Sequence, residues 1–456
     1  MNHRAQRSIR RRAIHVSASV ALCGLLAAAP PGPGSPPPGL QGEDLSAEQC
    51  ERITAAYTRG LRDFGTGDYR AAAESFRQAL EVNPLDDVAV YYLAAAYAGA
   101  GNAAVSLLWL NRLRELESCL RPTFPLFQSL RATEELRKVQ RALEQCSTCS
   151  PRSEIVVELA QEDVIPGSMA FDAVDGAFFF GDLHRGWIIR AAPAGDGRYS
   201  SRRFFEAGPD GAQVISGMKV DPVRRLLWVA ASTGRGAADP GPAATGGSAL
   251  FALDLGTAER VAWLEPESGR PHLLADIALS PNGDVAVADQ ASGEIWLFRG
   301  DSRVLELLVP GGVLHSPACV AFSADGQRLF AADRDRPGIY RADVRGGTVK
   351  CLPHCTGPAP VGVEGLHFLD DCLIAVVPGM AGGRVLRLGL SQDFDRIAAI
   401  DVIDCHHPPF VHPAAGTASS RYLYYLANTG YPGPPAEGKP PARSPNRNYV
   451  VLKLRL

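Results

Sequence analysis

Cysteine and histidine residues provide the first candidates for chemistry in this 456-residue sequence. Cys146-Ser-Thr-Cys149 has the spacing of a redox pair or of half a metal site, but no strand and helix of the thioredoxin type surround it. We therefore expect a local disulfide bridge there. Cys351-Leu-Pro-His-Cys355 places His354 between two thiols. Four metal ligands are not in view, so we expect a disulfide or free thiols.

Carboxylates are the second group of candidates. Asp276 begins the apolar stretch "DIALS" and Glu364 begins "EGLHFL", and carboxylate oxygens are ligands for divalent cations. Histidines are scattered near predicted strand ends, as is typical of exposed loops: His184, His272, His315, His367 and His412. The denser Cys405-His406-His407 precedes two prolines, which predicts a surface turn. No Gly-x-Ser-x-Gly sequence occurs, so a serine nucleophile has no support.

The elements that position these residues follow from a repeated phrase. Residues 272–298, "HLLADIALSPNGDVAVADQASGEIWLF", read as three short strands separated by turns. The first two strands recur six times, and the turn anchors lie 43 to 59 residues apart: Asp172, Asp221, Ser280, Ser323, Leu369 and Ser419. One four-stranded blade needs about 40 to 50 residues. Residues 152–456 therefore predict a six-bladed β-propeller.

The ends of the chain segment predict how this propeller closes. The last copy has only three strands and finishes on residues 448–456, so residues 153–160 should supply its missing outer strand. The second strands of the copies end on residues that hydrogen-bond their own backbone in turns: Asp182, Ser232, Asp289, Asp333 and Asn428. We interpret these five as structural.

A different periodicity precedes the propeller. Residues 45–146 contain a match to the tetratricopeptide repeat at seven positions: Gly60, Gly67, Tyr69, Ala72, Phe76, Ala79 and Pro84. The next 34 residues repeat the pattern more loosely, and residues 124–145 predict a capping helical pair. The fold class is thus helical repeats followed by an all-β propeller. Such repeats either bind a peptide or protein partner in a groove or pack on the neighbouring domain.

The N-terminus predicts export. Residues 1–29 combine five arginines with an apolar stretch that ends in alanines, and residues 30–44 form a Pro/Gly-rich linker. We expect a periplasmic or secreted protein, with an uncleaved membrane anchor as the alternative and with the general or twin-arginine route left open. The 46 basic and 49 acidic side chains give a net charge of −3, which disfavours a nucleic-acid partner.

The propeller segment resembles the gluconolactonase, senescence marker protein and luciferin-regenerating enzyme family. The resemblance covers residues 152–456 and rests on ordered phrases: "PGSMAFD", "GMKVDPVRRLLWVA", "DIALSPNGDVAVAD", "VAFSADGQRLFAAD", "VEGLHF" and "HPPFVHPAAGTASSRYLYYLAN". It implies a divalent cation, calcium or zinc, at the mouth of the central channel, where it polarises a lactone or ester carbonyl.

The positions that this resemblance assigns to the metal carry few oxygens in this chain. The family's Glu in Pro-Glu-Gly is Gly167, its Asn before Asp-Leu-Ala-Leu is Ala275, and its Asn in Pro-Asn-Gly is Ala318. A fourth ligand, normally Asp, is Glu364, and the blade-two substrate position is Ser216. One carboxylate with waters should not hold calcium at useful affinity.

Two functions remain open at this point. The favoured one is a binding module with a degenerate metal site, which holds a protein, glycan or small ligand and needs no cofactor. The alternative is a metal-dependent lactonase or esterase, in which a one-residue shift lets Asp276 join Glu364 as a ligand and in which the resemblance makes His184 a candidate base. In either case loops 233–247 and 429–447 could shape a pocket.

Overall fold

The computed structural model describes residues 44–456 except 145–148, 160–163, 184, 196, 208–212, 234–246, 268, 301, 379–382, 411, 420 and 429–447. The expected export signal, all of the linker but its last residue, and nearly all of the two long loops lie outside this part. Within it, every helix is too short or too polar to cross a membrane.

Six helical elements come first in the described chain: α2 (Ala47–Gly65), α3 (Tyr69–Val82), α4 (Asp87–Gly99), α5 (Ala103–Glu115), the 3₁₀ helix η1 (Pro125–Leu130) and α6 (Glu134–Glu144). Helices α2 to α5 each begin after a side chain that accepts a main-chain N–H of the first turn: Ser46, Asp68, Asp86 and Asn102. Such caps satisfy N–H groups that have no partner within the helix, which fixes where each helix starts.

Two glycines let these helices pack closely. A Cβ atom on Gly60 would lie 2.8 Å from the ring of Phe76, and one on Gly99 would lie 2.6 Å from the ring of Tyr69. Both distances are shorter than a van der Waals contact, so a larger residue would push the helices apart. Helices therefore form, and approach one another, where the repeat spacing predicts them.

Phe124, just before η1, covers the aromatic surface of these helices. Its ring lies 5.7 Å from that of Phe64, 5.3 Å from that of Tyr91 and 6.2 Å from that of Tyr92. Phe127 in η1 also contacts Tyr91, with ring centres 5.7 Å apart. A segment of the chain itself therefore occupies this apolar surface.

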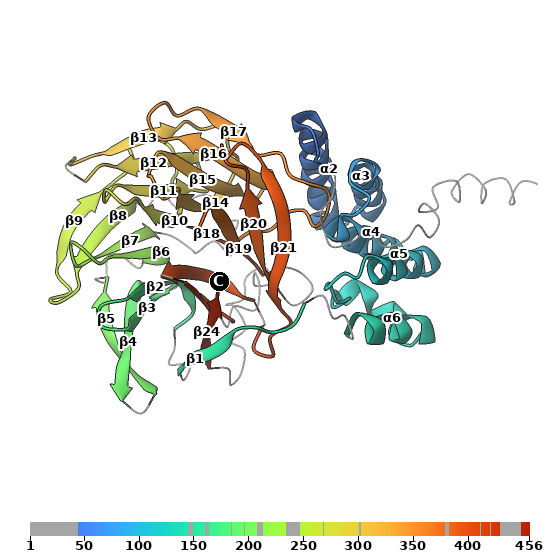
Figure 1. The fold of residues 1–456 in the computed structure, drawn as a ribbon, viewed down its shortest axis with the longest axis horizontal. Helices are drawn as coiled ribbons and strands as arrows, with labels where there is room; N and C mark the ends of the chain where they lie inside the picture. The colour runs from blue at the N-terminus through green and yellow to red at the C-terminus, as the bar shows by residue number, and fades with distance from the viewer. Residues whose placement is uncertain are drawn as a thin grey trace, which may run out of the picture. The chain divides into compact units, whose positions relative to one another are not determined.

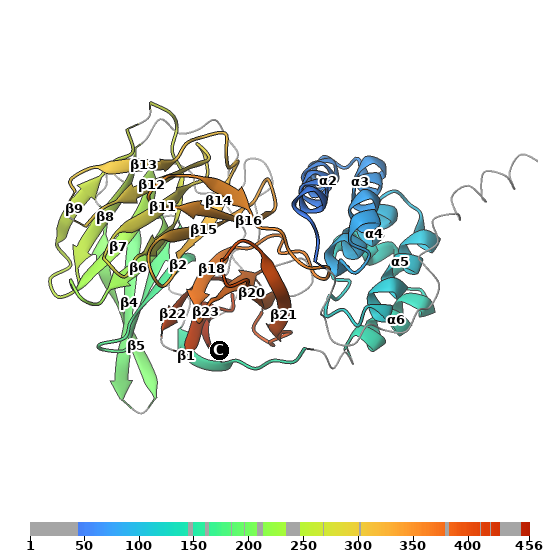
Figure 2. The same ribbon diagram turned by 45° about the horizontal axis from the view of Figure 1, so that its top comes forward.

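Six four-stranded antiparallel sheets follow and form a six-bladed propeller (Figures 1 and 2). The first five are β2 (Pro166–Asp172), β3 (Ala177–Asp182), β4 (Trp187–Gly195) and β5 (Arg198–Glu206); β6 (Gln213–Asp221), β7 (Leu226–Thr233), β8 (Ser248–Asp254) and β9 (Arg260–Leu264); β10 (Leu274–Leu279), β11 (Val285–Asp289), β12 (Glu294–Phe298) and β13 (Leu305–Val309); β14 (Pro317–Phe322), β15 (Arg328–Asp333), β16 (Gly338–Asp343) and β17 (Val349–Cys351); β18 (Gly365–Leu369), β19 (Cys372–Val377), β20 (Arg384–Leu390) and β21 (Ile397–Cys405).

The sixth blade closes the ring. It orders β22 (Ala414–Ser419), β23 (Tyr422–Leu426) and β24 (Tyr449–Arg455) with β1 (Glu154–Leu159) on the outside. Strand β1 pairs antiparallel with β24, so the two ends of the propeller segment share one sheet. The predicted closure is confirmed, and it pairs a C-terminal strand edge that would otherwise be exposed.

The residues that end the second strands of the blades mainly accept hydrogen bonds from main-chain N–H groups. Asp182, Asp289 and Asp333 each accept main-chain N–H groups from the turn that follows and from the segment before the innermost strand of the same blade. Ser232 instead accepts the N–H of β10 in the next blade, at 3.1 Å. The side-chain oxygen of Asn428 is buried and has no hydrogen-bond partner among the described residues. The structural interpretation thus holds for the three aspartates.

The disulfide differs from the expectation. Cys149 pairs with Cys405, with Cα atoms 6.1 Å apart, so the predicted local bridge between Cys146 and Cys149 is wrong. The bond ties the segment before β1 to the end of β21 across 256 residues of sequence. Local spacing carries no information about a partner so distant. Cys351 and Cys355 both keep their thiols, which was one of the two expected states.

A polar contact joins the α3–α4 turn to the propeller. Asp87 and Arg384 form an ion pair at 3.2 Å, and their side chains are only 7% and 4% exposed. Ser118 donates a further hydrogen bond to Asp87 at 2.8 Å. Asn83 donates to the Gly357 carbonyl at 2.9 Å and accepts the Gly357 N–H at 3.2 Å. The N-terminal helices therefore pack on the propeller through buried, directional bonds.

Candidate functional site

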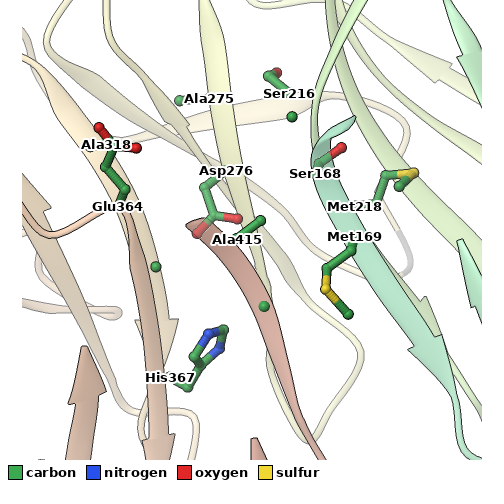
Figure 3. Close-up of a pocket in the computed structure, with 13 residues that line it drawn as sticks. Ser168, Met169, Ser216, Met218, Ala275, Asp276, Ala318, Glu364, His367 and Ala415 are labelled. Carbon is green, nitrogen blue, oxygen red and sulfur yellow. The ribbon is translucent and has the colours of Figure 1, made fainter. Parts of the chain in front are cut away.

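A cavity of about 50 Å³ opens at the centre of the propeller (Figure 3). Thirteen residues line it, and they come from the beginnings of all six innermost strands: β2, β6, β10, β14, β18 and β22. Its volume is room for a few water molecules or for one small chemical group.

Irregular pairing turns these residues inward. In five blades the register between the innermost strand and its neighbour shifts at the first residues of the strand. An unpaired residue at such a bulge is directed away from the regular alternation. The residues at the five shifts all line the cavity: Gly167, Ser216, Ala275 with Asp276, Ala318, and Ala415.

The cavity brings together most of the residues singled out from the sequence. Gly167, Ser216, Ala275, Asp276, Ala318 and Glu364 all line it. The candidate base His184 lies outside the described residues. Ala275 and Asp276 both face the cavity because the bulge in β10 spans two residues, so no shift of the whole strand is needed to bring Asp276 there.

Gly167 lacks a carboxylate, and the space beside it would not admit one. A Cβ atom built on it would lie 2.1 Å from Cδ2 and 2.5 Å from Cγ of Leu183. The side chain of Leu183 therefore occupies the space into which a glutamate at position 167 would project. Ala318 and Ala275 likewise present only methyl groups. Three of the four ligand positions implied by the resemblance thus offer no side-chain oxygen.

The two serines in the cavity hold neighbouring blades together. Ser168 Oγ donates to the Ile215 carbonyl at 3.1 Å, which joins β2 to β6. Ser216 Oγ lies 3.2 Å from the Ala230 carbonyl of its own blade and also bonds the Leu274 carbonyl of the next blade. Each hydroxyl has one proton, so these bonds leave only lone pairs for a ligand.

Glu364 is already engaged by two basic side chains. Its Oε2 lies 3.3 Å from Nε2 of His412, and its Oε1 lies 3.9 Å from the guanidinium of Arg334. Burial favours the neutral acid, but the bond from His412 and the charge of Arg334 outweigh it and lower the pKa of Glu364. A carboxylate near the channel mouth is therefore ionised and partly neutralised without a metal.

Asp276 is less well compensated. Its Oδ2 accepts the Val320 N–H at 3.2 Å, and β6 comes so close that a Cβ on Gly217 would lie 2.9 Å from the Asp276 Cα. Burial raises the pKa of Asp276, and the charge of Lys219 lowers it only in part. The site therefore disfavours the ionised form of Asp276.

One residue of the channel lies in a different environment from the one expected from the sequence. His367, expected in an exposed loop, is 7% exposed on β18, and its Nε2 is buried without a hydrogen-bond partner. A Cβ on Gly416 would lie 3.0 Å from that nitrogen, so glycine keeps the space beside it open. Burial, then the charge of Lys219, lowers the pKa of His367 well below its ordinary value. Lys219 itself donates to the Gly416 carbonyl at 3.2 Å.

Strand alternation is the signal that could have placed His367 correctly. Gly365 and His367 on β18 are two residues apart and share a face of the strand. Both line the cavity. Counting inward positions along this strand would thus have placed a histidine at the channel.

These residues do not fit a divalent cation. The channel offers two carboxylates, one of which is engaged by His412 and Arg334, whereas calcium takes six to eight oxygens. Within the described residues, clusters of three close ligand atoms occur elsewhere: Cys119, Cys149 and Cys405, and His272, Asp289 and Glu294. The first includes the disulfide. In the second, Asp289 Oδ2 already bonds His272 at 2.5 Å.

Comparisons with known proteins find distant structural similarities. No protein-family model matches the sequence, and no curated protein matches it. Solved structures that resemble the chain include a gluconolactonase from Xanthomonas campestris, at 14% identity and a TM-score of 0.44 over 67% of this chain and 95% of that one. A luciferin-regenerating enzyme shows 12% identity and a TM-score of 0.46 over 67% and 96%. Virginiamycin B lyase from Staphylococcus aureus shows 14% and 0.42 over 59% and 80%.

At these identities and scores the comparisons assign neither a family nor an activity to this chain. The function has to be argued from the channel itself.

Proposed function

We propose that the propeller binds a small molecule at the mouth of its central channel and does not use a metal to hydrolyse it. The observation that carries this proposal is that Gly167, Ala275 and Ala318 line the cavity at the positions where the family that the sequence resembles has metal ligands. Without those oxygens, a cation that could polarise a carbonyl has no adequate set of ligands.

The state of the remaining groups supports binding rather than metal chemistry. Glu364 already contacts His412 and lies 3.9 Å from Arg334, and both serine protons are taken by main-chain carbonyls. A preorganised concave site with a few polar groups among apolar ones is typical of ligand pockets. Met169 and Met218 supply much of the apolar wall.

A metal-dependent lactonase or esterase is the second candidate. The observation in its favour is that Asp276 and Glu364 line the same cavity, so two carboxylates do face one space. A calcium or zinc ion that used both would compete with His412 and Arg334 for Glu364. The two candidates therefore differ in whether metal changes the state of Glu364.

For the N-terminal part we propose tetratricopeptide-like repeats that serve to hold the propeller. The buried Asp87–Arg384 pair supports this role, and Phe124 covers an apolar surface that a peptide partner would otherwise use. We further propose that the protein acts in the periplasm or outside the cell, as its first 29 residues suggest.

The test combines ligand binding with hydrolysis. Purified protein freed of metal with a chelator is screened by thermal melting against sugars, amines, organic acids and lactones, and lactone opening is followed in parallel. Binding to the native state raises the melting midpoint. A ligand-dependent rise that Glu364→Gln alters and the exposed control Glu267→Gln does not, without turnover, supports the proposal. Lactone opening that requires calcium or zinc would overturn it.

A further inference from the structure

The hydrogen-bonding groups of the cavity are mostly acceptors. Ser168 and Ser216 offer only lone pairs, because their protons go to main-chain carbonyls. The carboxylates of Asp276 and Glu364 are acceptors whenever they are ionised. A ligand that satisfies these groups must therefore bring hydrogen-bond donors.

The charge of the cavity also favours a ligand that brings hydrogen-bond donors, and in particular a cation. Among the described residues that line it, Asp276 and Glu364 are the acidic ones and none is lysine or arginine. Lys219 stands outside the lining and donates to the Gly416 carbonyl, and Arg334 is 43% exposed and 3.9 Å from Glu364. Because burial disfavours the charge of Asp276, a cation placed beside it would gain energy that a neutral ligand would not.

His367 is an independent sign of a ligand. Its side chain is 93% buried, lines the cavity, and presents an Nε2 atom that bonds nothing in the described structure. A buried polar atom left unpaired is costly, and such atoms in native proteins call for an explanation. A neutral imidazole nitrogen can accept an N–H from a bound group. Figure 3 shows His367, Asp276 and Glu364 around the same space.

We propose that the channel mouth binds a small organic ammonium ion, whose N–H groups bond Asp276, Glu364 and His367 and whose carbon chain lies against the methionines. This rests on the proposed function and names the class of its ligand. The enclosed space of about 50 Å³ holds the ammonium group and few carbon atoms, so the rest of a larger amine would extend through the mouth.

The experiment is a calorimetric titration of the metal-free protein with straight-chain alkylammonium chlorides of increasing length. Glycerol and the sodium salts of the matching carboxylic acids are titrated at equal ionic strength. We expect the ammonium ions to bind at least tenfold more tightly than the carboxylates, which the acidic side chains of the cavity would repel. The same margin is expected over glycerol, because hydrogen bonds between charged groups are worth more than those of a neutral ligand. Tighter binding of glycerol or a carboxylate would overturn the ammonium assignment and leave small-molecule binding standing.

Three variants complete the test. Asp276→Asn and Glu364→Gln should each weaken ammonium binding by about tenfold or more, whereas the exposed control Glu267→Gln should not change it. Because burial disfavours the charge of Asp276, its Asn variant is expected to fold and to melt no lower than the parent, which keeps its binding result interpretable. Unchanged binding in both channel variants would refute the assignment. Failure of every organic ligand, with metal-dependent lactone opening, would refute the proposed function instead.

Discussion

A buried ion pair joins Asp87 of α4 to Arg384 of the propeller, and breaking it tests how much the pair stabilises the contact between the N-terminal helices and the propeller. Asp87→Asn leaves the Arg384 guanidinium, 4% exposed, without its carboxylate. Removing one partner of a buried pair costs about 3–5 kcal/mol. The exposed pair of Glu74 and Arg77, at 53% and 36% exposure, gives the matched control. Glu74→Gln should cost about 0–1 kcal/mol.

Urea unfolding, followed by the circular dichroism of the helices and by tryptophan fluorescence, measures both costs. The double variant Asp87→Asn with Arg384→Met should recover part of the loss, because it leaves no unpaired buried charge. The expected order of stability is parent and Glu74→Gln, then the double variant, then Asp87→Asn. If Asp87→Asn were as stable as Glu74→Gln, the pair would not hold the repeats in place.

Three further variants test a buried carboxyl group, the packing of two innermost strands and the disulfide. Burial raises the pKa of Asp86 to about 7, so the folded state keeps a proton that the unfolded state releases above about pH 4. The stability that Asp86 contributes therefore falls as pH rises from about 4 to about 7. The melting midpoint of Asp86→Asn should change less with pH across that range than the midpoint of the parent. An identical dependence of the midpoint on pH would contradict the raised pKa of Asp86. Gly217→Ala should lower the free energy of unfolding, measured by urea denaturation, by about 1–3 kcal/mol, because its Cβ would lie 2.9 Å from the Asp276 Cα. An unchanged urea midpoint would show that the backbone of β10 moves to accommodate the added methyl group. Non-reducing peptide mapping should recover Cys149 linked to Cys405, and Cys149→Ser should lower the unfolding free energy by about 2–5 kcal/mol, whereas recovery of any other partner for Cys149 would exclude this bridge.

The blades were predictable because one phrase recurs six times, and each copy carries its own turn and alternation. The closing strand was predictable too, since a three-stranded last copy leaves an edge that only residues before the first blade can cover. Ring closure then brings all six innermost strands to one axis. That is why Gly167, Ser216, Ala318 and Glu364, far apart in the sequence, line one cavity.

What the sequence hid depends on local geometry and on long-range contacts. A bulge has no fixed residue pattern, so the two-residue bulge that turns both Ala275 and Asp276 inward could not be read from alternation. Nor does the sequence show that the side chain of Leu183 fills the space beside Gly167. His367 was interpreted as a loop residue although its strand position placed it inside.

The proposed function requires that the channel lack an adequate set of ligands for a divalent cation. Calorimetric titration of chelator-treated protein with calcium and zinc tests it most directly. A variant that introduces oxygen ligands at the cavity wall, Gly167→Glu with Ala275→Asn and Ala318→Asn, and with Leu183→Ala to make room, is the positive control. We predict no saturable binding by the parent at the channel and measurable binding by the restored variant. Stoichiometric binding of either ion by the parent, abolished by Glu364→Gln, would contradict the account.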